Sequence, residues 1–319
     1  MAVYTQVPAE EMAALLTRYG LGALRSAKGI AEGVENSNYL VEAERGRFIL
    51  TLYEKRVDAG DLPFFLALLD HLADHGLRVP RALRDREGAQ IQTVCGRPAC
   101  LIEFLPGVSL SHPTPRQARA AGEALGRMHV ALADFPEQRP NTLGPDAWRA
   151  LAARCGDAVE TIQPGLAARI ADELAFLDAH WPHDLPHAVI HGDLFPDNVL
   201  MLGDRVTGMI DFYFACTELR AWDLAVTHSA WAFSADGHDF DSAVGCALVD
   251  GYADAFGLGD AERAALPVLA RGAALRFTLT RAWDWLNTPA DALVTRKDPL
   301  AFLRRLDAYA ARGAEMFAL

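Results

Sequence analysis

One segment constrains this chain more than any other: the run from His191 to Leu200, with the sequence HGDLFPDNVL. Short apolar runs precede and follow it, and the second of them ends in Asp211. Apolar runs separated by Gly, Asp, Pro and Asn predict two buried strands joined by a tight loop. An ordinary turn would explain these residue types, but it would not require Asp193, Asn198 and Asp211 at their particular spacing.

The spacing of these three polar residues is that of a phosphoryl-transfer loop. In protein kinases an Asp of the catalytic loop accepts the proton of the substrate hydroxyl, and a later Asn and an Asp on the next strand hold Mg²⁺. Asp193, Asn198 and Asp211 occupy the corresponding positions. The sequence therefore predicts a loop that gathers two carboxylates and an amide around nucleotide-bound metal.

The length and composition allow a large protein with two lobes. The chain has 319 residues, 51% of them hydrophobic, and a formal net charge of −12. It has no block of Lys and Arg residues, so we expect no nucleic-acid partner. We also expect no membrane partner, since no apolar run is long enough for a span. The odd number of cysteines and the lack of a CxxC pair argue against zinc and disulfides, so we expect a cytoplasmic protein.

The patterns along the chain predict an α+β protein in two parts. The first part, to about residue 104, is rich in strands and turns, with two helices predicted at 8–19 and 61–75. The run that ends in Glu103-Phe104-Leu105-Pro106-Gly107 has the character of a hinge near 103–107. From 105 to 319 helical spacing dominates, with helices predicted at 115–134, 148–159, 166–179, 242–255, 261–286 and 298–317.

With these motifs in place, the chain resembles the aminoglycoside-phosphotransferase-like branch of the kinases. Within that branch it is most similar to the bacterial homoserine kinases. The resemblance rests on the loop and on the phrases ENSNY (35–39), RFILTLY (47–53), DLPFF (61–65), IDFY (210–213) and RFTLTR (276–281). It implies a protein-kinase-like fold whose small antiparallel lobe covers the nucleotide and whose helical lobe binds the substrate. It also implies ATP and Mg²⁺, and phosphorylation of the L-homoserine hydroxyl in threonine biosynthesis.

The resemblance assigns roles to individual residues of the loop. Asp193 is expected to be the catalytic base, and His191 is expected to brace the loop without reacting. Asn198 and Asp211 are expected to bind Mg²⁺. Asp223, at the start of a predicted helix, is expected to cap or brace the same loop.

The nucleotide contacts are expected in the first lobe. Asn36, Ser37 and Asn38 would lie over the phosphates. Glu103 and Leu105 would border the adenine pocket.

The chain departs from the protein-kinase pattern at two places. Thr51 stands where the third strand of protein kinases carries a phosphate-binding Lys. Lys55 lies four residues later, either reaching the phosphates or standing as a surface lysine. Tyr213 replaces the Gly of the Asp-Phe-Gly motif, a change that leaves the Asp211 carboxylate in place.

Acceptor binding is predicted less sharply. The carboxylate of homoserine calls for an arginine, and Arg276, Arg281 and Arg220 are the candidates. Asp284 is an alternative, structural partner for Arg281. The same fold acting on choline, ethanolamine, methylthioribose or an aminoglycoside is one alternative function, and a non-catalytic nucleotide-binding scaffold is another. Nothing in the sequence predicts an oligomeric state.

Overall fold

A computed structural model describes residues 4–30, 36–54, 58–288 and 296–317 of the chain. Lys55 and most of the predicted phosphate-covering turn, residues 31–35, lie outside the described residues. The chain divides into two compact units, Met1–Pro106 and Gly107–Leu319. Among the described helices, none combines the length and the apolar character that crossing a bilayer requires.

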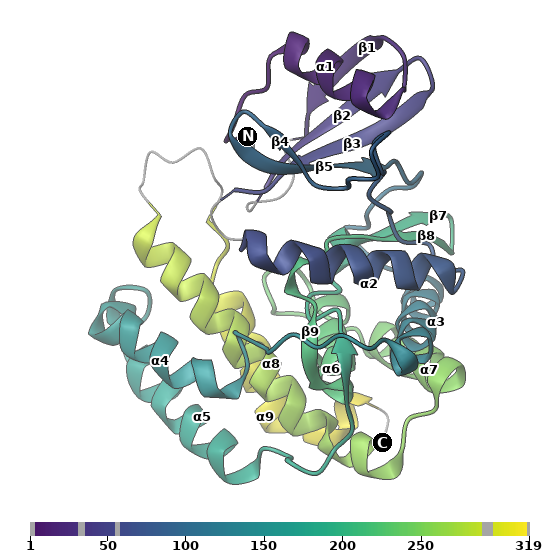
Figure 1. Ribbon diagram of the computed structural model, residues 1–319. Helices are drawn as coiled ribbons and strands as arrows, with labels where there is room; N and C mark the ends of the chain where they lie inside the picture. The colour runs from purple at the N-terminus through teal and green to yellow at the C-terminus, as the bar shows by residue number, and fades with distance from the viewer. Residues whose placement is uncertain (1–3, 31–35, 55–57, 289–295, 318–319) are drawn as a thin grey trace. The chain divides into compact units, whose positions relative to one another are not determined.

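The N-terminal unit is built on one antiparallel sheet with the strand order β1-β2-β3-β5-β4 (Figure 1). The strands are β1 (Leu24–Gly29), β2 (Ser37–Ala43), β3 (Gly46–Leu52), β4 (Gln92–Val94) and β5 (Arg97–Glu103). Along β2 buried residues alternate with half-buried ones, because successive side chains of a strand point to opposite faces. Helix α1 (Ala9–Tyr19) contributes Met12, Leu15 and Leu16 to the same core as Val41 and Leu50.

The two helices expected in this unit are present. Helix α1 follows Pro8 and ends at Gly20, whose φ of 69° is the left-handed conformation that glycine adopts at helix ends. Helix α2 (Leu62–Asp74) carries a proline in its first turn, where the missing N–H group costs no hydrogen bond.

The C-terminal unit is mostly helical and contains two short pairs of antiparallel strands, β6 with β9 and β7 with β8. The helices are α3 (Pro115–Ala131), α4 (Pro145–Cys155), α5 (Leu166–His180), α6 (Arg220–Trp231), α7 (Ser242–Phe256), α8 (Asp260–Asn287) and α9 (Leu300–Arg312). The strands are β6 (His187–Ile190), β7 (Val199–Leu202), β8 (Arg205–Met209) and β9 (Cys216–Leu219).

Two of the predicted helices differ most from the observed ones at their ends. The helix expected at 148–159 is α4, which begins earlier at Pro145 and ends at Cys155, because Gly156 takes a φ of 52° and the chain continues as a 3-10 turn. The helix expected at 298–317 is α9 to Arg312, followed by a 3-10 turn from Gly313, again at positive φ. Glycine ended both helices earlier than the apolar spacing suggested.

Helices α3 and α7 pack against each other through glycines. A Cβ atom on Gly122 of α3 would collide with the backbone of Leu248, and one on Gly251 of α7 would collide with the backbone of Arg119. The absence of side chains at these positions lets the two helix backbones approach closely. The close approach brings polar residues of α3 and α7 within hydrogen-bonding distance of each other, as described below.

Helix α6 is the central helix of this unit, with every residue from Ala221 to Trp231 buried. It also anchors the end of the chain, since His228 Nδ1 lies 2.6 Å from the Tyr309 hydroxyl and Nε2 lies 3.2 Å from the Met316 carbonyl oxygen. Burial lowers the pKa of His228 to about 3, so the ring is neutral and donates from Nε2. A helix fixed in this way provides a rigid support for the residues of the candidate site.

Candidate active site

The loop His191–Phe195 connects β6 to a 3-10 turn at Pro196–Asn198. The buried carboxylate of Asp223 holds the backbone of this loop. Asp223, in the first turn of α6, accepts hydrogen bonds from the backbone N–H groups of His191 and Gly192, both at 2.8 Å. Its side chain is fully buried. The prediction that Asp223 braces the loop is confirmed.

The Asp223 carboxylate has a further partner from the α3–α7 crossing. His129 of α3 donates from Nε2 to Asp223 at 3.1 Å, and its Nδ1 lies 2.8 Å from the hydroxyl of Tyr252 on α7. Burial alone would raise the pKa of Asp223, but its hydrogen bond and charge interaction with His129 and the nearby His191 leave that pKa below its usual value. Asp223 is therefore an ionised carboxylate that orients the loop. Sequence reasoning missed His129, which stands alone near the end of an amphipathic helix with no motif around it.

The His191 ring ties the loop to the strand that precedes Asp211. Nε2 donates to the carbonyl oxygen of Ile210 at 3.0 Å, and Nδ1 accepts from the backbone N–H of Asp193 at 3.3 Å. Burial lowers the pKa of His191, so the ring is neutral with its proton on Nε2. The residue has no exposed surface. It can brace the loop, but it has no access to a substrate.

Asp193 and Asn198 belong to the same hydrogen-bonded turn. The Asn198 side-chain nitrogen donates to the Asp193 carbonyl oxygen at 2.8 Å and lies 3.4 Å from its carboxylate Oδ2. The Asn198 carbonyl oxygen in turn accepts from the backbone N–H of Ile210 at 3.0 Å. Ile210 is thus bonded both to Asn198 and to the His191 ring, and these bonds hold the residue directly before Asp211 against the loop.

Asp211 itself has an exposed side chain and a left-handed backbone, with φ 65° and ψ 57°. Aspartate is one of the few residues besides glycine that adopt this conformation with any frequency. The turn reverses the chain after β8 and starts the 3-10 helix Phe212–Phe214. The structure therefore brings Asp193 and Asn198 into contact, and it places Asp211 next to Ile210, which is bonded to Asn198 and to the His191 ring.

Arg276 of α8 also binds the loop. Its Nη1 donates to the Gly192 carbonyl oxygen at 2.6 Å and lies 3.9 Å from Asp193 Oδ1. The guanidinium packs over the rings of Phe277 and Phe214, at 4.3 and 5.3 Å from their centroids. Arg276 places a positive charge beside the Asp193 carboxylate and fixes the loop backbone at the same time.

The other two candidate arginines differ from each other. Arg220 forms a two-point ion pair with the buried carboxylate of Glu262, at 2.7 and 2.9 Å, so its guanidinium is already bound within the unit and we do not propose it as a substrate ligand. Arg281 of α8 donates to the Asp298 carbonyl oxygen at 3.3 Å. Burial lowers the pKa of Arg281 to about 10, while the negative charge of Asp193 acts in the opposite direction. This interaction places Arg281 in the electrostatic environment of the loop.

The residues expected to lie over the phosphates belong to the N-terminal unit. The Ser37 hydroxyl is fully buried; it accepts from the N–H groups of Tyr4 and Thr5 and donates to Glu54 at 2.7 Å. These contacts use Ser37 to fasten the N-terminal segment onto β2, so its hydroxyl is committed within the unit. Asn36 is also buried and accepts from the Glu54 N–H at 3.5 Å.

Thr51 and Asn38 form a cross-strand pair on β3 and β2. The Thr51 hydroxyl donates to the Asn38 side-chain oxygen at 2.7 Å, and Thr51 is 3% exposed. At the end of β5, Glu103 exposes its side chain, and its backbone N–H donates to the Arg81 carbonyl oxygen at 2.9 Å. Leu105 follows as a half-buried residue. Contacts of these residues with a nucleotide remain predictions.

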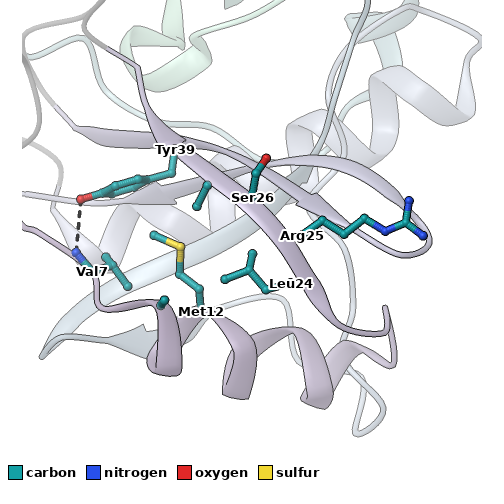
Figure 2. Close-up of a pocket in the computed structure, with 8 residues that line it drawn as sticks. Val7, Met12, Leu24, Arg25, Ser26 and Tyr39 are labelled. Carbon is teal, nitrogen blue, oxygen red and sulfur yellow. Dashed lines mark hydrogen bonds between the residues drawn. The ribbon is translucent and has the colours of Figure 1, made fainter.

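A hollow of about 450 Å³ in the N-terminal unit has none of these residues in its lining (Figure 2). Its lining includes Val7 and Met12 near α1, Leu24 and Ser26 on β1, and Tyr39 on β2. The Tyr39 hydroxyl accepts from the Val7 N–H at 3.2 Å across it. The lining contains no carboxylate and none of the predicted site residues, so we assign it no part in the reaction.

Comparison with protein families agrees with this reading of the geometry. Residues 26–275 of the chain match the family described as the phosphotransferase enzyme family. The chain is 55% identical to a homoserine kinase of Zymomonas mobilis over 317 residues, which covers 99% of each chain. It is 53% identical to a homoserine kinase of a Methylobacterium species over 306 residues, 96% of this chain and 95% of that one.

Solved structures with a similar fold have more distant sequences. A choline kinase from Cryptosporidium parvum superimposes with a TM-score of 0.69 at 14% identity, covering 98% of this chain and 97% of the other. A spectinomycin phosphotransferase in complex with ADP and spectinomycin also gives 0.69, at 15% identity, covering 99% and 98%. At these identities the likeness shows the fold, which is the protein-kinase-like α+β fold expected from the sequence.

Proposed function

From one premise, that this chain belongs to the phosphotransferase enzyme family, we propose that it transfers the γ-phosphoryl group of ATP to the hydroxyl of L-homoserine. The product is O-phospho-L-homoserine, an intermediate of threonine biosynthesis. The acceptor follows from the relatives, since homoserine kinases match this chain at more than half identity over almost its whole length. The main structural support for phosphoryl transfer is the braced loop, which holds the half-buried Asp193 carboxylate beside the side chain of Asn198.

Asp193 acts as the base in the proposed reaction. The acceptor oxygen forms a bond to the γ-phosphorus, the bond from that phosphorus to the bridging oxygen of ADP breaks, and the hydroxyl proton moves to the Asp193 carboxylate. The brace formed by Asp223 and His191 fixes the direction of this carboxylate before the substrate arrives. Arg276 stabilises the loop by its bond to Gly192 and offsets negative charge beside the reacting groups.

The donor groups of the loop also fit Mg²⁺, which prefers oxygen ligands. Asn198 directs its side-chain nitrogen toward Asp193, so its amide oxygen is the atom left to bind metal. Asp211 offers an exposed carboxylate from the neighbouring turn. When bound there, Mg²⁺ supplies positive charge to the transferring phosphoryl group. Asn198 and Asp211 are the residues that we propose hold it.

The nucleotide and acceptor contacts complete the proposal. The backbone around Asn36 and Asn38 and the end of β5 near Glu103 and Leu105 are the proposed nucleotide-binding segments of the N-terminal unit, with 1–104 as the nucleotide-covering lobe and 105–319 as the catalytic lobe. Arg281 is the proposed ligand of the acceptor carboxylate.

The five cysteines are all free thiols, as a protein of a reducing cytoplasm would have.

A panel of alcohols in a coupled ADP-release assay tests the function directly. The acceptors are L-homoserine, choline, ethanolamine, methylthioribose and an aminoglycoside, each at equal concentration with ATP and Mg²⁺. We expect L-homoserine to give the highest kcat/KM, with O-phospho-L-homoserine as the product identified by mass spectrometry. A higher kcat/KM for another alcohol would reassign the acceptor, and no transfer to any of them would favour the scaffold alternative.

The metal assignment predicts a specific defect in Asp211→Asn. Asparagine keeps the size of the side chain and tolerates a left-handed backbone, but it lacks the negative charge that binds the cation. We expect the Mg²⁺ concentration for half-maximal activity to rise at least about 10-fold. The measurement is a Mg²⁺ titration at saturating ATP. Asp204→Asn, in the exposed turn between β7 and β8, is the matched control and should titrate like the wild type; equal titrations for all three proteins would remove Asp211 from the metal site.

A further inference from the structure

Arg305 of α9 is a buried positive charge that the reaction described above does not use. The residue is 3% exposed, and its guanidinium packs over the rings of Phe302 and Phe233, at 4.1 and 5.7 Å from their centroids. Nη2 donates to the Ser234 carbonyl oxygen at 2.9 Å. Within the described part of the chain, Nε and Nη1 have no hydrogen-bond partner, and no carboxylate forms an ion pair with Arg305.

A guanidinium in such surroundings is unfavourable by itself, because water is removed and only Nη2 finds acceptors, the carbonyl oxygens of Ser234 and Ala235, among the described residues. Burial lowers the pKa of Arg305 to about 10, and the positive charge of Arg281 contributes in the same direction, while Tyr309 and Asp236 act in the opposite direction without forming an ion pair. The group nevertheless keeps its charge at neutral pH. Binding an anion would supply both the missing acceptors and the missing negative charge.

Arg281 lies against the same aromatic ring as Arg305. Its guanidinium is 4.4 Å from the centroid of Phe302, so the two cations are separated by little more than one side chain. Its hydrogen bond to the Asp298 carbonyl oxygen is long, at 3.3 Å. Two adjacent like charges repel each other, and the repulsion is stronger where water is excluded. The pair is therefore suited to a ligand with a negative charge.

This arginine pair lies beside the catalytic loop. Phe195, two residues after Asp193, contacts Phe302 and Phe277 at ring-centroid distances of 6.0 and 4.9 Å. The same helix that carries Arg281 also carries Arg276, which is bonded to the loop backbone. Phe302 thus contacts Arg281, Arg305 and a residue of the catalytic loop, and an anionic group held by the two arginines would be bound about one aromatic ring away from that loop.

We propose that Arg281 and Arg305 together form the subsite for the acceptor carboxylate, with Arg305 as the residue that determines selection of an amino acid over an amino alcohol. This assignment rests on the proposed function, since it names the place where the carboxylate of homoserine binds. A carboxylate accepts hydrogen bonds from guanidinium groups and neutralises them. The subsite explains how α9 accommodates a buried cation that forms no ion pair within the described residues.

The test compares L-homoserine with 3-aminopropan-1-ol, which has the same hydroxyl, the same chain and the same amine but no carboxylate. We expect Arg305→Met to lower kcat/KM for L-homoserine about 100-fold, the loss typical of a charged hydrogen bond. The kcat/KM for 3-aminopropan-1-ol should stay within about 3-fold of the wild-type value. The ratio of kcat/KM for L-homoserine to that for 3-aminopropan-1-ol would then fall close to one, mainly through a higher KM for L-homoserine.

Two further variants separate binding from folding. Arg312→Met removes the same charge from an exposed position of α9 and should leave both substrates unaffected. Arg281→Met removes the other half of the subsite and should reproduce the selective loss, which keeps the proposal testable if Arg305→Met folds poorly. Equal losses for both substrates in Arg305→Met and Arg281→Met would show a structural role only, and no loss for L-homoserine would place its carboxylate elsewhere; either result overturns the proposal.

The outcome for the wild type distinguishes this inference from the proposed function. If the wild type phosphorylates L-homoserine and the arginine variants keep its preference for that substrate, the subsite is wrong and the function stands. If the wild type prefers a carboxylate-free alcohol such as choline or ethanolamine, both the function and the subsite are wrong.

Discussion

Asp193→Asn is expected to lower kcat about 10³-fold while nucleotide affinity stays within about 3-fold of the wild type. Asparagine has the same shape but cannot take the hydroxyl proton, so the loss falls on the transfer step. The side-chain contact with Asn198 persists in the variant, because an amide oxygen can accept the same hydrogen bond. Single-turnover phosphoryl transfer measures the first effect, and titration with a non-hydrolysable ATP analogue measures the second.

Asp197→Asn is the matched control for this experiment, because Asp197 lies in the same segment but exposes its side chain to solvent. It should retain a kcat close to that of the wild type. If Asp193→Asn kept a near wild-type rate, the base would have to be another group. If both variants lost activity equally, the effect would come from the charge of the segment and not from proton transfer.

Asp223→Ala is expected to lower the free energy of unfolding by about 3–5 kcal/mol and to reduce kcat at the same time. Its carboxylate is the acceptor for three donors, the N–H groups of His191 and Gly192 and the ring of His129, and all three lie in the interior. Without it these donors are buried and unsatisfied, and the loop loses its fixed position. Urea unfolding measures the stability, and steady-state kinetics at a temperature where the variant remains folded measures the rate.

Asp250→Ala provides the comparison for stability, since Asp250 is an exposed carboxylate of α7. We expect it to change the free energy of unfolding by less than about 0.5 kcal/mol. An Asp223→Ala protein with wild-type stability and rate would mean that the loop does not depend on this brace.

The sequence predicted the placement of the loop residues well, because the information is local. Asp193, Asn198 and Asp211 are close along the chain, and the apolar runs around them fix which side of the turn they occupy. The helices were predicted for the same reason, and the errors fell at their ends, where Gly156 and Gly313 stop α4 and α9. The helical spacing of apolar residues continues past such glycines, whereas the α-helical conformation of the backbone ends there.

Residues whose partners are distant in sequence could not be predicted in this way. His129 and Asp223 are separated by 94 positions, and only the close crossing of α3 with α7 and the packing of α6 bring them together. Arg305 gave no signal, since a single arginine in an amphipathic helix is usually a surface residue. Ser37 was expected near the phosphates from its place at a turn, and its hydroxyl contacts with the N-terminal segment and Glu54 could not be predicted from that local pattern.

The brace beneath the loop also has a consequence for enzyme engineering. Asp223 of α6 holds the loop, and His129 of α3 and Tyr252 of α7 support Asp223 in turn, whereas the two arginines proposed to bind the acceptor carboxylate come from α8 and α9. The support of the loop and the proposed acceptor subsite thus lie on different helices, and α8 and α9 meet the loop through Arg276 and the rings of Phe277 and Phe302. A chimera that exchanges the α8–α9 surface but retains Arg276 should accept a new alcohol without having to rebuild the reaction centre.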